Sequence, residues 1–453
     1  MNWKFGASSL AWCASCGCNM ADPRAQLFAL VDANNFYASC EKSFQPRLRD
    51  RPVVVLSNND GCVVARSKEV KALGIVKMGQ PWFQMQDLAR QHGIVGLSSN
   101  YTVYADMSNR IMTILRTYSP HVEVYSIDEA FVSLNGMGGL WESPTAMGQH
   151  MRAKILKWVN LPVCVGVGAS KTQAKLANHI AKEFPLFDSV CDLSSMSAAR
   201  MRWLFVRIDV GEVWGVGRRI GDKLRALGIN TVQDLKEAEP RDMRAKFGIL
   251  MERTVQELRG LSCLDLEEVA PPRKEIVSSK SFGSMVHTYD ELAEAVTAYV
   301  TRAAEKLRGQ GSVCGAVNVF IQTNRFRSDD LQYGNSRTVP IIVPTDDTRV
   351  LAGAALHGLD RIFREGFRYK KAGVQLMDIS PKGTLQGVLF DEARPSESGD
   401  KVMAALDALN QRFGRDAVKL ASAGLAPRWA MRSENKTPCY TTRWDELPVA
   451  RAN

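Results

Sequence analysis

Three acidic side chains stand where apolar segments of the chain end or turn. Asp32 ends the hydrophobic run Leu27–Val31, and Asp128 and Glu129 lie in the turn of an expected hairpin. An unpaired carboxylate at the end of a buried strand is costly, and a bound cation offsets that cost. Carboxylates gathered at one sheet edge suit hard ions such as Mg²⁺, and two such ions support in-line phosphoryl transfer. The three residues are therefore candidate ligands for two Mg²⁺ ions.

A purely structural interpretation competes with the metal site. Asp32 could cap the helix that follows it, and the Asp128–Glu129 turn could be an ordinary connection. Each motif taken alone fits that interpretation about equally well. The metal site requires Asp32 to lie beside the Asp128–Glu129 turn, so the fold decides between the two.

The segments that must position these acids alternate between strand and helix. Short apolar runs predict strands, and apolar residues at helical spacing predict the helices between them. This order predicts an α+β sheet of the split-βαβ kind with its helices on one face. The expected strands are 27–31, 52–56, the hairpin 122–134 and 162–167, and the expected helices are 36–43, 101–118, 144–159 and 171–183.

The second half of the chain changes character twice. Residues 196–265 carry only helical periods, including a helix over 218–227 that Gly228 ends. Pro271 and Pro272 suggest a linker, after which 275–380 returns to strands with two helices, at 289–308 and 347–365. Beyond residue 391 a linker-like stretch precedes a helix with four apolar residues on one face: Val402, Leu406, Leu409 and Phe413.

Length and composition predict a basic, multidomain protein. The chain has 453 residues, and its 58 Lys and Arg exceed its 48 Asp and Glu, giving a net charge of +10. A basic balance suits a polyanionic partner such as nucleic acid, although alone it is weak support. No apolar run approaches the roughly 20 residues that a membrane span needs, so we expect no membrane partner. Single cysteines inside apolar segments (Cys62, Cys164, Cys314) predict reduced thiols and a cytoplasmic location.

Residues 1–26 do not fit the pattern of a folded segment. Their apolar run is too short for a secretion signal, and Cys13, Cys16 and Cys18 have no fourth metal ligand nearby. We interpret this stretch as an unstructured N-terminal extension, with Met20 an alternative start.

Two segments, Val31–Glu41 and Tyr125–Phe131, resemble the metal-binding motifs of the Y-family translesion DNA polymerases, most closely those of the UmuC branch. The likeness covers residues 27 to 445. Five further segments share it: Pro52–Leu56, Ser99–Tyr104, Gly166–Thr172, Trp214–Gly217 and Tyr440–Arg443.

The resemblance implies an α+β, multidomain right-hand polymerase with a split-βαβ palm, small fingers, a helical thumb and an α+β little finger. It implies template-directed addition of deoxynucleotides to a DNA primer, with low fidelity, in SOS-type damage tolerance and mutagenesis. The implied domains are a palm (27–46 and 106–195), fingers (47–105), a thumb with a helix-hairpin-helix (196–268), a little finger (269–380) and a clamp-binding linker with tail (381–453).

The resemblance also implies roles for single residues. Asp32, Asp128 and Glu129 would be catalytic and hold two Mg²⁺ ions, with the Ala33 carbonyl as a further ligand. Tyr37 would be the steric gate that rejects a ribose 2′-OH, although a buried core aromatic is the plainer interpretation. The implied nucleotide-binding residues are Phe36, Tyr37, Arg66, Lys71 and Lys175.

Glycines and basic residues outside the palm are candidates for DNA contact. Trp214–Gly217 is similar to a helix-hairpin-helix turn, in which glycines let backbone N–H groups approach a phosphate. Basic residues after 320 could follow the duplex backbone, although an ordinary solvated face is the alternative. The predicted DNA-binding residues are Gly215, Gly217, Arg218, Arg219, Arg325, Arg327, Arg337 and Lys370.

A short apolar motif predicts a protein partner. Gln386, Leu389 and Phe390 resemble the peptide that bacterial replication proteins insert into the sliding clamp. The resemblance also implies a processed UmuD-type dimer and RecA as partners, besides primer-template DNA and dNTP.

Two other classes share some of these features. A palm-fold nucleotide cyclase could carry the paired carboxylates without using a template. A catalytically idle DNA- or clamp-binding protein could keep the basic surfaces. The expected thumb and little finger argue against the first, and the three retained acids argue against the second.

Overall fold

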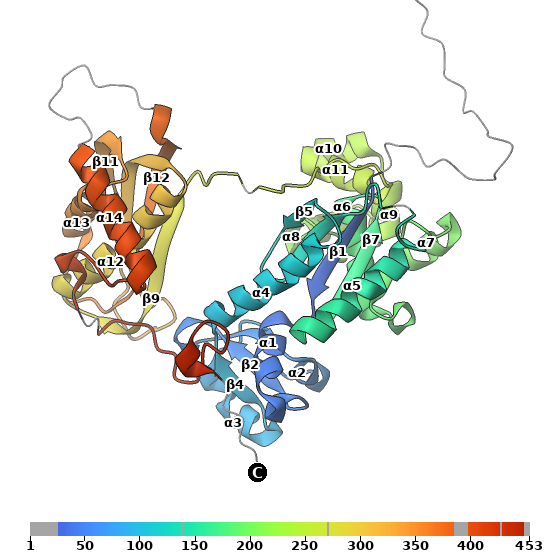
Figure 1. Cartoon of the computed structure of the whole chain (residues 1–453), viewed down its shortest axis with the longest axis horizontal. Helices are drawn as coiled ribbons and strands as arrows, with labels where there is room; N and C mark the ends of the chain where they lie inside the picture. The colour runs from blue at the N-terminus through green and yellow to red at the C-terminus, as the bar shows by residue number, and fades with distance from the viewer. Residues whose placement is uncertain (1–25, 138, 270, 385–396, 426–427, 448–453) are drawn as a thin grey trace, which may run out of the picture. The chain divides into compact units, whose positions relative to one another are not determined.

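The computed structural model describes residues 26–137, 139–269, 271–384, 397–425 and 428–447. The chain divides into two compact units, labelled by element in Figure 1. Unit 1 comprises residues 1–43 and 102–269, and unit 2 comprises 44–101 and 270–453. Most of the predicted N-terminal extension, with its three cysteines, lies outside the described residues.

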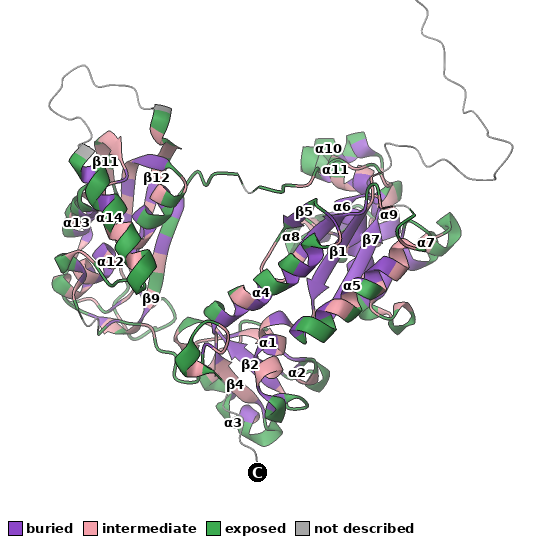
Figure 2. Cartoon of the chain, viewed as in Figure 1, coloured by how far each residue is buried: buried purple, intermediate pink, exposed green. Residues whose placement is uncertain are grey.

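Unit 1 is built on a five-stranded sheet in the order β5-β6-β1-β7-β8. β1 is buried at every position, as the apolar run 28–31 predicts for a central strand, and its burial includes Asp32 (Figure 2). β5 and β6 pair antiparallel, which confirms the predicted hairpin, and β7 pairs parallel with β8. The strands are β1 (Phe28–Ala33), β5 (Val122–Val124), β6 (Glu129–Ser133), β7 (Val163–Gly168) and β8 (Val190–Asp192).

Helices cover both faces of this sheet. Val165 of β7 faces Gly148 of α5, whereas the neighbouring Gly166 faces α6, where a Cβ would stand 2.3 Å from the Ala174 carbonyl oxygen. Successive strand residues point to opposite faces, so α5 and α6 lie on opposite sides. α4 lies on the α5 side (Figure 1), since Tyr118 just beyond α4 hydrogen-bonds His150 of α5. The prediction that all helices share one face is therefore wrong, and it holds only for α4 and α5.

The four helices nearest the sheet follow the predicted ranges within a few residues. Two have a serine side chain at the N-cap, Ser143 before α5 and Ser170 before α6. The helices are α1 (Phe36–Phe44), α4 (Tyr101–Arg116), α5 (Pro144–Val159) and α6 (Lys171–Glu183).

The rest of unit 1 is helical, as the loss of strand signals after residue 196 predicted. The apolar faces of these helices pack on Leu176, Ala177 and Ile180 of α6. They are α7 (Ala198–Phe205), α8 (Arg218–Ala226), α9 (Val232–Glu237), α10 (Pro240–Phe247) and α11 (Ile249–Leu258).

Unit 2 contains a small part, residues 44–101, which we call the three-stranded module. Its sheet runs β3-β2-β4, with β2 antiparallel to β3 and parallel to β4. Its core includes the fully buried Val54, Leu56 and Val63. The elements are β2 (Val53–Leu56), β3 (Val63–Arg66), α2 (Lys68–Leu73), α3 (Trp82–His92) and β4 (Val95–Ser98).

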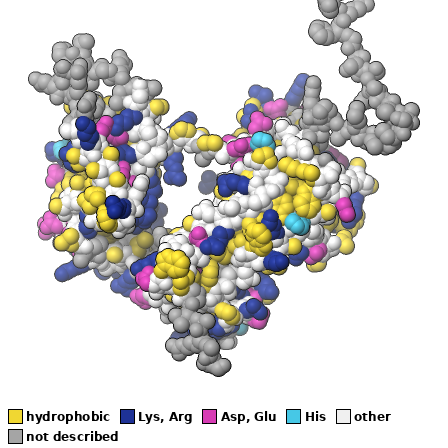
Figure 3. Space-filling model, in the orientation of Figure 1, with side chains coloured by type: hydrophobic (Ala, Val, Ile, Leu, Met, Phe, Trp, Pro, Cys, Tyr) yellow, Lys and Arg dark blue, Asp and Glu magenta, His cyan; other side chains and the backbone are white. Residues whose placement is uncertain are grey.

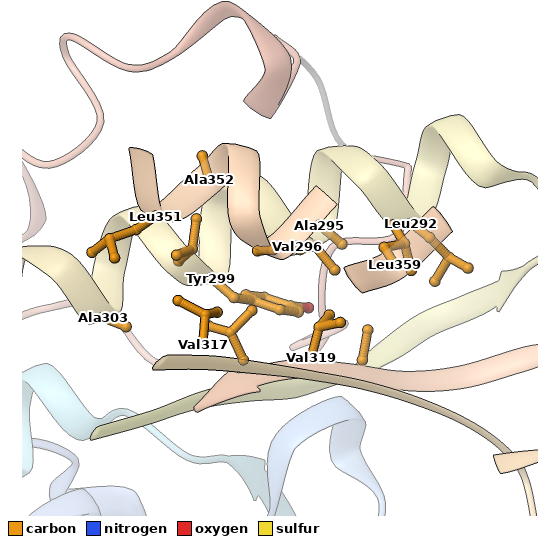
Figure 4. Close-up of a cluster of buried hydrophobic side chains, with 14 of the residues drawn as sticks. Leu292, Ala295, Val296, Tyr299, Ala303, Val317, Val319, Leu351, Ala352 and Leu359 are labelled. Atoms are coloured by element: carbon orange, nitrogen blue, oxygen red, sulfur yellow. The ribbon is translucent and has the colours of Figure 1, made fainter. Parts of the chain in front are cut away.

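The larger part of unit 2, residues 271–384, we call the four-stranded domain. Its sheet runs β11-β10-β12-β9, and two helices cover one face over a core centred on Tyr299, Val317 and Leu351 (Figure 4). The elements are β9 (Ile276–Val286), α12 (Tyr289–Gly309), β10 (Ser312–Thr323), β11 (Gly334–Thr345), α13 (Thr348–Ile362) and β12 (Tyr369–Pro381).

The predicted helix beyond residue 391 is α14 (Glu397–Phe413). Its four-residue apolar face is not a buried face, since Val402, Leu409 and Phe413 are exposed. Met403, one position along, is the buried apolar side chain instead.

The cysteines match the predicted reduced state. All seven within the described ranges are free, and Cys164 and Cys314 are buried, while Cys62 is half-buried. Within the same ranges, no helix combines the length and the apolar character that crossing a membrane requires.

Candidate active site

The register of the five-stranded sheet places two of the predicted acids side by side. Asp32 on β1 pairs directly with Glu129 on β6, and paired residues of an antiparallel ladder point to the same face. The Ala33 N–H donates to the Asp128 carbonyl oxygen at 2.9 Å, so the backbone of the third acid is held there as well. The juxtaposition that the metal site required is present.

Helix α6 brings two lysines to these acids. Lys175 Nζ lies 2.8 Å from Glu129 Oε2, and Lys182 Nζ lies 2.7 Å from Asp32 Oδ1. The lysines are seven residues apart, which is two helical turns, so both project from one face. The sequence analysis named Lys175 but missed Lys182, which the seven-residue spacing on a predicted helix could have revealed.

Burial makes the two acids electrostatically unusual. Asp32 is 8% exposed, and this burial raises its pKa to about 7; a hydrogen bond with Glu129 adds to the rise, while Lys182 opposes it. Burial also acts to raise the pKa of Glu129, but its hydrogen bonds to Asp32 and Lys175 outweigh this and hold the pKa below its ordinary value. Near neutral pH the pair therefore retains a proton on Asp32 that a nearby cation would expel.

Asp128 points into its own turn. The Ser126 hydroxyl donates to Asp128 Oδ1 at 2.6 Å and accepts from the Asp128 and Glu129 N–H groups. Among the described residues, no group of three or more His, Cys, Asp or Glu side chains is arranged to hold a metal ion. The structure thus brings together the side chains of Asp32 and Glu129, with the Asp128 carboxylate hydrogen-bonded nearby.

The donor set nevertheless fits a divalent cation. Carboxylate oxygens beside a backbone carbonyl are ligands that Mg²⁺ accepts, and a buried acid with a raised pKa shows where positive charge is lacking.

The predicted steric gate lies in an aromatic cluster of unit 1. The half-buried Tyr37 ring stacks on Tyr104, with centroids 4.6 Å apart and 17° between planes. Phe36 is buried next to it, and the Tyr104 hydroxyl donates to Glu41 Oε1 at 2.6 Å. The stack fixes the Tyr37 ring, which fits both a gate and a partly buried packing residue.

A loop predicted to contact DNA also borders the acids. Trp214 Nε1 donates to the Tyr125 hydroxyl at 3.2 Å, and Lys175 Nζ lies 4.6 Å from the Tyr125 ring centroid. Gly215 adopts φ 87°, a left-handed backbone that glycine accepts without strain. The loop ends at Gly217, the N-cap of α8, and the predicted Arg218 and Arg219 follow as exposed residues.

Two predicted nucleotide-binding residues belong to unit 2. Arg66 on β3 donates from Nη1 to the Val76 carbonyl oxygen at 2.5 Å, and Lys71 is exposed on α2. Both lie in the three-stranded module.

The predicted DNA contacts of the four-stranded domain differ in exposure. Arg325, Arg327 and Arg337 are exposed, whereas Lys370 is half-buried. Lys370 Nζ donates to the Phe282 carbonyl oxygen at 2.5 Å, and burial lowers its pKa. Figure 3 shows Lys and Arg side chains on the visible faces of both units. The predicted clamp motif, Gln386, Leu389 and Phe390, lies outside the described residues.

Comparison with known proteins identifies the family. Residues 31–179 match the impB/mucB/samB family and residues 273–389 its C-terminal domain. The chain belongs to this family. Residues 400–450 match a domain of unknown function.

Its relatives extend over nearly the whole chain. Protein UmuC of Salmonella typhimurium is 49% identical over 93% of this chain and 99% of its own length. Protein ImpB of the same species is 46% identical over 94% and 100%. DNA polymerase IV of Moorella thermoacetica is 29% identical over 87% and 96%.

A solved Y-family DNA polymerase, a Dbh–Dpo4 chimera, shares the fold, with a TM-score of 0.62 over 78% of this chain and 99% of that chain at 20% identity. The predicted fold class is thereby confirmed. As a member of this family the protein is a DNA-directed DNA polymerase of the Y family. This membership favours a polymerase over the template-free cyclase.

Proposed function

We propose that the protein is an error-prone translesion polymerase that extends a DNA primer opposite damaged template by two-ion phosphoryl transfer, in SOS-type damage tolerance and mutagenesis. The observation that carries the proposal is the pairing of Asp32 with Glu129 at one end of a buried sheet, next to Asp128. Burial disfavours negative charge on these carboxylates, and a bound cation would offset that cost. Carboxylates gathered in this way are the ligands that a polymerase needs to hold its cations.

The ligands for Mg²⁺ would be the side chains of Asp32, Asp128 and Glu129 and the Ala33 carbonyl. Two bound Mg²⁺ ions would supply activation of the attacking oxygen and stabilisation of the leaving one. Lys175 and Lys182, which pair with Glu129 and Asp32, would contact the triphosphate of the bound nucleotide.

Tyr37 would discriminate against ribonucleotides by its fixed ring. Its stacking on Tyr104 limits rotation, so a 2′-OH next to the ring meets a side chain that cannot move aside. Phe36, the first residue of α1, is buried in the core and holds the start of the helix that carries Tyr37. Arg66 and Lys71 would approach the nucleotide from the three-stranded module.

The domain roles that the resemblance implied remain part of this proposal. Residues 27–46 and 106–195 would be the palm, 47–105 the fingers, 196–268 the thumb, 269–380 the little finger and 381–453 the clamp-binding linker and tail. Between residues 47 and 100 the α-helices are the short α2 and α3, which favours a loosely enclosed base pair and low fidelity. The proposed partners are the sliding clamp through Gln386, Leu389 and Phe390, a processed UmuD-type dimer and RecA.

Primer extension tests this function. The full-length protein, with and without the processed UmuD-type dimer, would be given primed templates that are undamaged or carry one abasic site. We expect Mg²⁺-dependent extension on both templates and its loss in Asp128→Ala. Asp87→Asn, at a side chain 91% exposed, is the matched control. Extension by Asp128→Ala at the rate of the control would contradict the metal assignment.

A further inference from the structure

The stretch matched to a domain of unknown function has no part in the mechanism above. It spans residues 400–450, of which the structure describes 400–425 and 428–447. Within unit 2 this stretch touches the four-stranded domain first and the three-stranded module afterwards. Its contacts, taken in chain order, point to what it does.

Helix α14 anchors the stretch on the four-stranded domain. Arg308 of α12 holds Asp407 by two hydrogen bonds, Nε to Oδ2 at 2.6 Å and Nη2 to Oδ1 at 2.7 Å. The Arg308 Nη1 group donates to the Asp346 carbonyl oxygen at 2.8 Å. Lys382 bridges the carboxylates of Asp346 and Asp400 at 2.8 and 2.9 Å. A two-pronged guanidinium–carboxylate contact with little exposure is among the stronger polar interactions in proteins, so this end is firmly held.

Residues 428–440, which we call the strap, begin in the same domain. Trp429 is 8% exposed. Its ring makes T-shaped contacts with Phe282 and Tyr299, with ring centroids 6.1 and 5.6 Å apart. The Gly283 N–H donates to the Trp429 carbonyl oxygen at 3.2 Å. A Cβ on Gly283 would stand 2.2 Å from the Ala430 carbonyl oxygen, so only glycine allows the strap to cross β9 here.

The strap then reaches a turn of the three-stranded module. The Arg432 N–H donates to Asn59 Oδ1 and the Glu434 N–H to Asp60 Oδ2, both at 2.9 Å. Asn59 and Asp60 have φ of 62° and 48°, a left-handed conformation that Asn and Asp tolerate better than most residues. The Asn59 amide also donates to the Ser281 carbonyl oxygen of β9 at 2.9 Å. One side chain therefore joins the module, the strap and the four-stranded domain.

The strap next lines the free edge of β4. The Ser98 N–H donates to the Asn435 carbonyl oxygen at 3.1 Å, and the Asn435 N–H donates to Ser98 Oγ at 3.0 Å. Asn100, with no exposed surface, donates its amide to the Thr437 and Pro438 carbonyl oxygens at 2.9 and 3.2 Å. Backbone groups on an open sheet edge otherwise invite pairing with other chains, and the strap takes up the Ser98 N–H at the end of β4.

The strap ends on an aromatic contact. The Tyr440 ring stacks on Phe44 at the start of the three-stranded module, with centroids 5.0 Å apart and 21° between planes. The module and the four-stranded domain consequently cluster in one compact unit, although residues 102–269 separate them in the chain.

We propose that the domain of unknown function is an intramolecular clasp. The surface formed by Gly283, Asn59, Asp60, Ser98 and Asn100 is a peptide-binding site, and its ligand is the strap of the same chain. α14 fixes the clasp on the four-stranded domain, and the strap binds the three-stranded module to that domain, so that the two parts move as one body. The inference is independent of the proposed translesion chemistry.

Release of the strap by a single methyl group is the first test. Gly283→Ala places a Cβ where the strap passes, and Gly353→Ala on α13 is the matched control, since nothing lies within 4 Å of its Cβ. In the full-length protein, brief trypsin treatment followed by mass spectrometry would time cleavage after Arg432 and Lys436. We expect cleavage about tenfold faster in Gly283→Ala than in the control. Equal cleavage rates in both variants would overturn the proposal.

A second variant covers the case in which Gly283→Ala does not fold. Asn100→Leu keeps the side-chain size and removes the amide donors to the strap, while Asn109→Leu on the exposed side of α4 is its control. Hydrogen exchange at residues 428–440 should rise about tenfold only in Asn100→Leu. Unchanged exchange would show that these bonds do not hold the strap.

A covalent trap distinguishes binding within one chain from exchange between chains. The native Cys439 Sγ lies 3.7 Å from Asn100 Oδ1, so Asn100→Cys should form a disulfide with Cys439 under mild oxidation. Peptide mapping should find this bond in monomeric protein at low concentration. A bond found only in covalent dimers would mean that the strap binds a second copy, which would overturn the clasp.

Discussion

The lysines of helix α6 belong to two carboxylate–lysine clusters. The clusters differ in how many hydrogen-bond partners their charged groups have. At its first turn, Lys171 binds Glu123 and donates to the Asp265 carbonyl oxygen, and Glu123 also accepts from the Glu267 N–H at 2.7 Å. Further along, Lys175 and Lys182 meet Glu129 and Asp32. In the first cluster the backbone supplies further partners, and the side chains are only 4% and 8% exposed.

We call the first cluster closed and the second cluster open, because the side chains of the second are more exposed to solvent. The Lys175 and Lys182 side chains are 25% and 35% exposed, and the buried Asp32 retains a pKa of about 7 despite its lysine. A cluster that only stabilised the fold would satisfy its charges as Glu123 and Lys171 do. The incompletely neutralised charge of the second cluster therefore supports the proposed cation site at Asp32 and Glu129.

The two clusters should respond in opposite ways when one charged partner is removed from each. Asp32→Asn should lower the rate of primer extension by roughly a thousandfold, because a cation ligand is lost. Its thermal midpoint should stay the same or rise, since a buried carboxylate with a raised pKa is replaced by a neutral group. Single-turnover kinetics and thermal unfolding on the same preparation measure both. A large loss of stability would mean that Asp32 belongs to the structural class.

The closed cluster should respond in the opposite way. Lys171→Met leaves Glu123 buried without its partner, which should reduce the free energy of unfolding by about 3–5 kcal/mol. Urea titration of the variant measures this, with Lys157→Met on the exposed side of α5 as control. The extension rate per folded molecule should remain near that of the parent. A small stability change with lost extension would reverse the assignment of the two clusters.

The sequence predicted the open cluster better than the closed one, for a physical reason. Asp32 and the Asp128–Glu129 turn interrupt apolar segments, and such interruptions are visible without a structure. The Glu123–Lys171 pair depends on residues 265 and 267 returning to the sheet, which no local pattern encodes.

Other features were beyond local patterns in the same way. The alternation of strands and helices predicted an α+β sheet, but it predicted neither β8 nor the separate sheet that contains β2. The placement of α6 opposite α5 depends on Gly166 of β7 accepting α6, while Gly148 of α5 lies against Val165 on the other face. The sequence did not predict the strap, because Asn59, Asn100 and Gly283 lie far from residues 428–440 in the chain and contact them only in the folded structure.

Added Mg²⁺ should stabilise unit 1 more at high pH than at low pH. The pKa of Asp32 in the folded protein is about 7 against an ordinary 3.8, so burial of its charge costs stability increasingly as pH rises through this range. A cation must displace the proton below pH 7 but meets an ionised carboxylate above it. We expect Mg²⁺ to raise the thermal midpoint by about 2–4 °C more at pH 8 than at pH 6. The Asp32→Asn variant is the control, and the pH dependence should vanish in it.

The smallest effect should come from Lys182. It tests whether this lysine acts on the pKa of Asp32 or only on the structure. Lys182 opposes the rise in the Asp32 pKa, so Lys182→Ala should move this pKa above 7. The acidic limb of the pH–rate profile for extension should then shift toward higher pH, with a loss of about threefold at pH 7 that recovers near pH 8.5. Lys182→Arg keeps the charge and should restore the parental profile. Because a merely structural lysine would lower the rate equally at every pH, a uniform loss would place Lys182 with Lys171 rather than with the reactive pair.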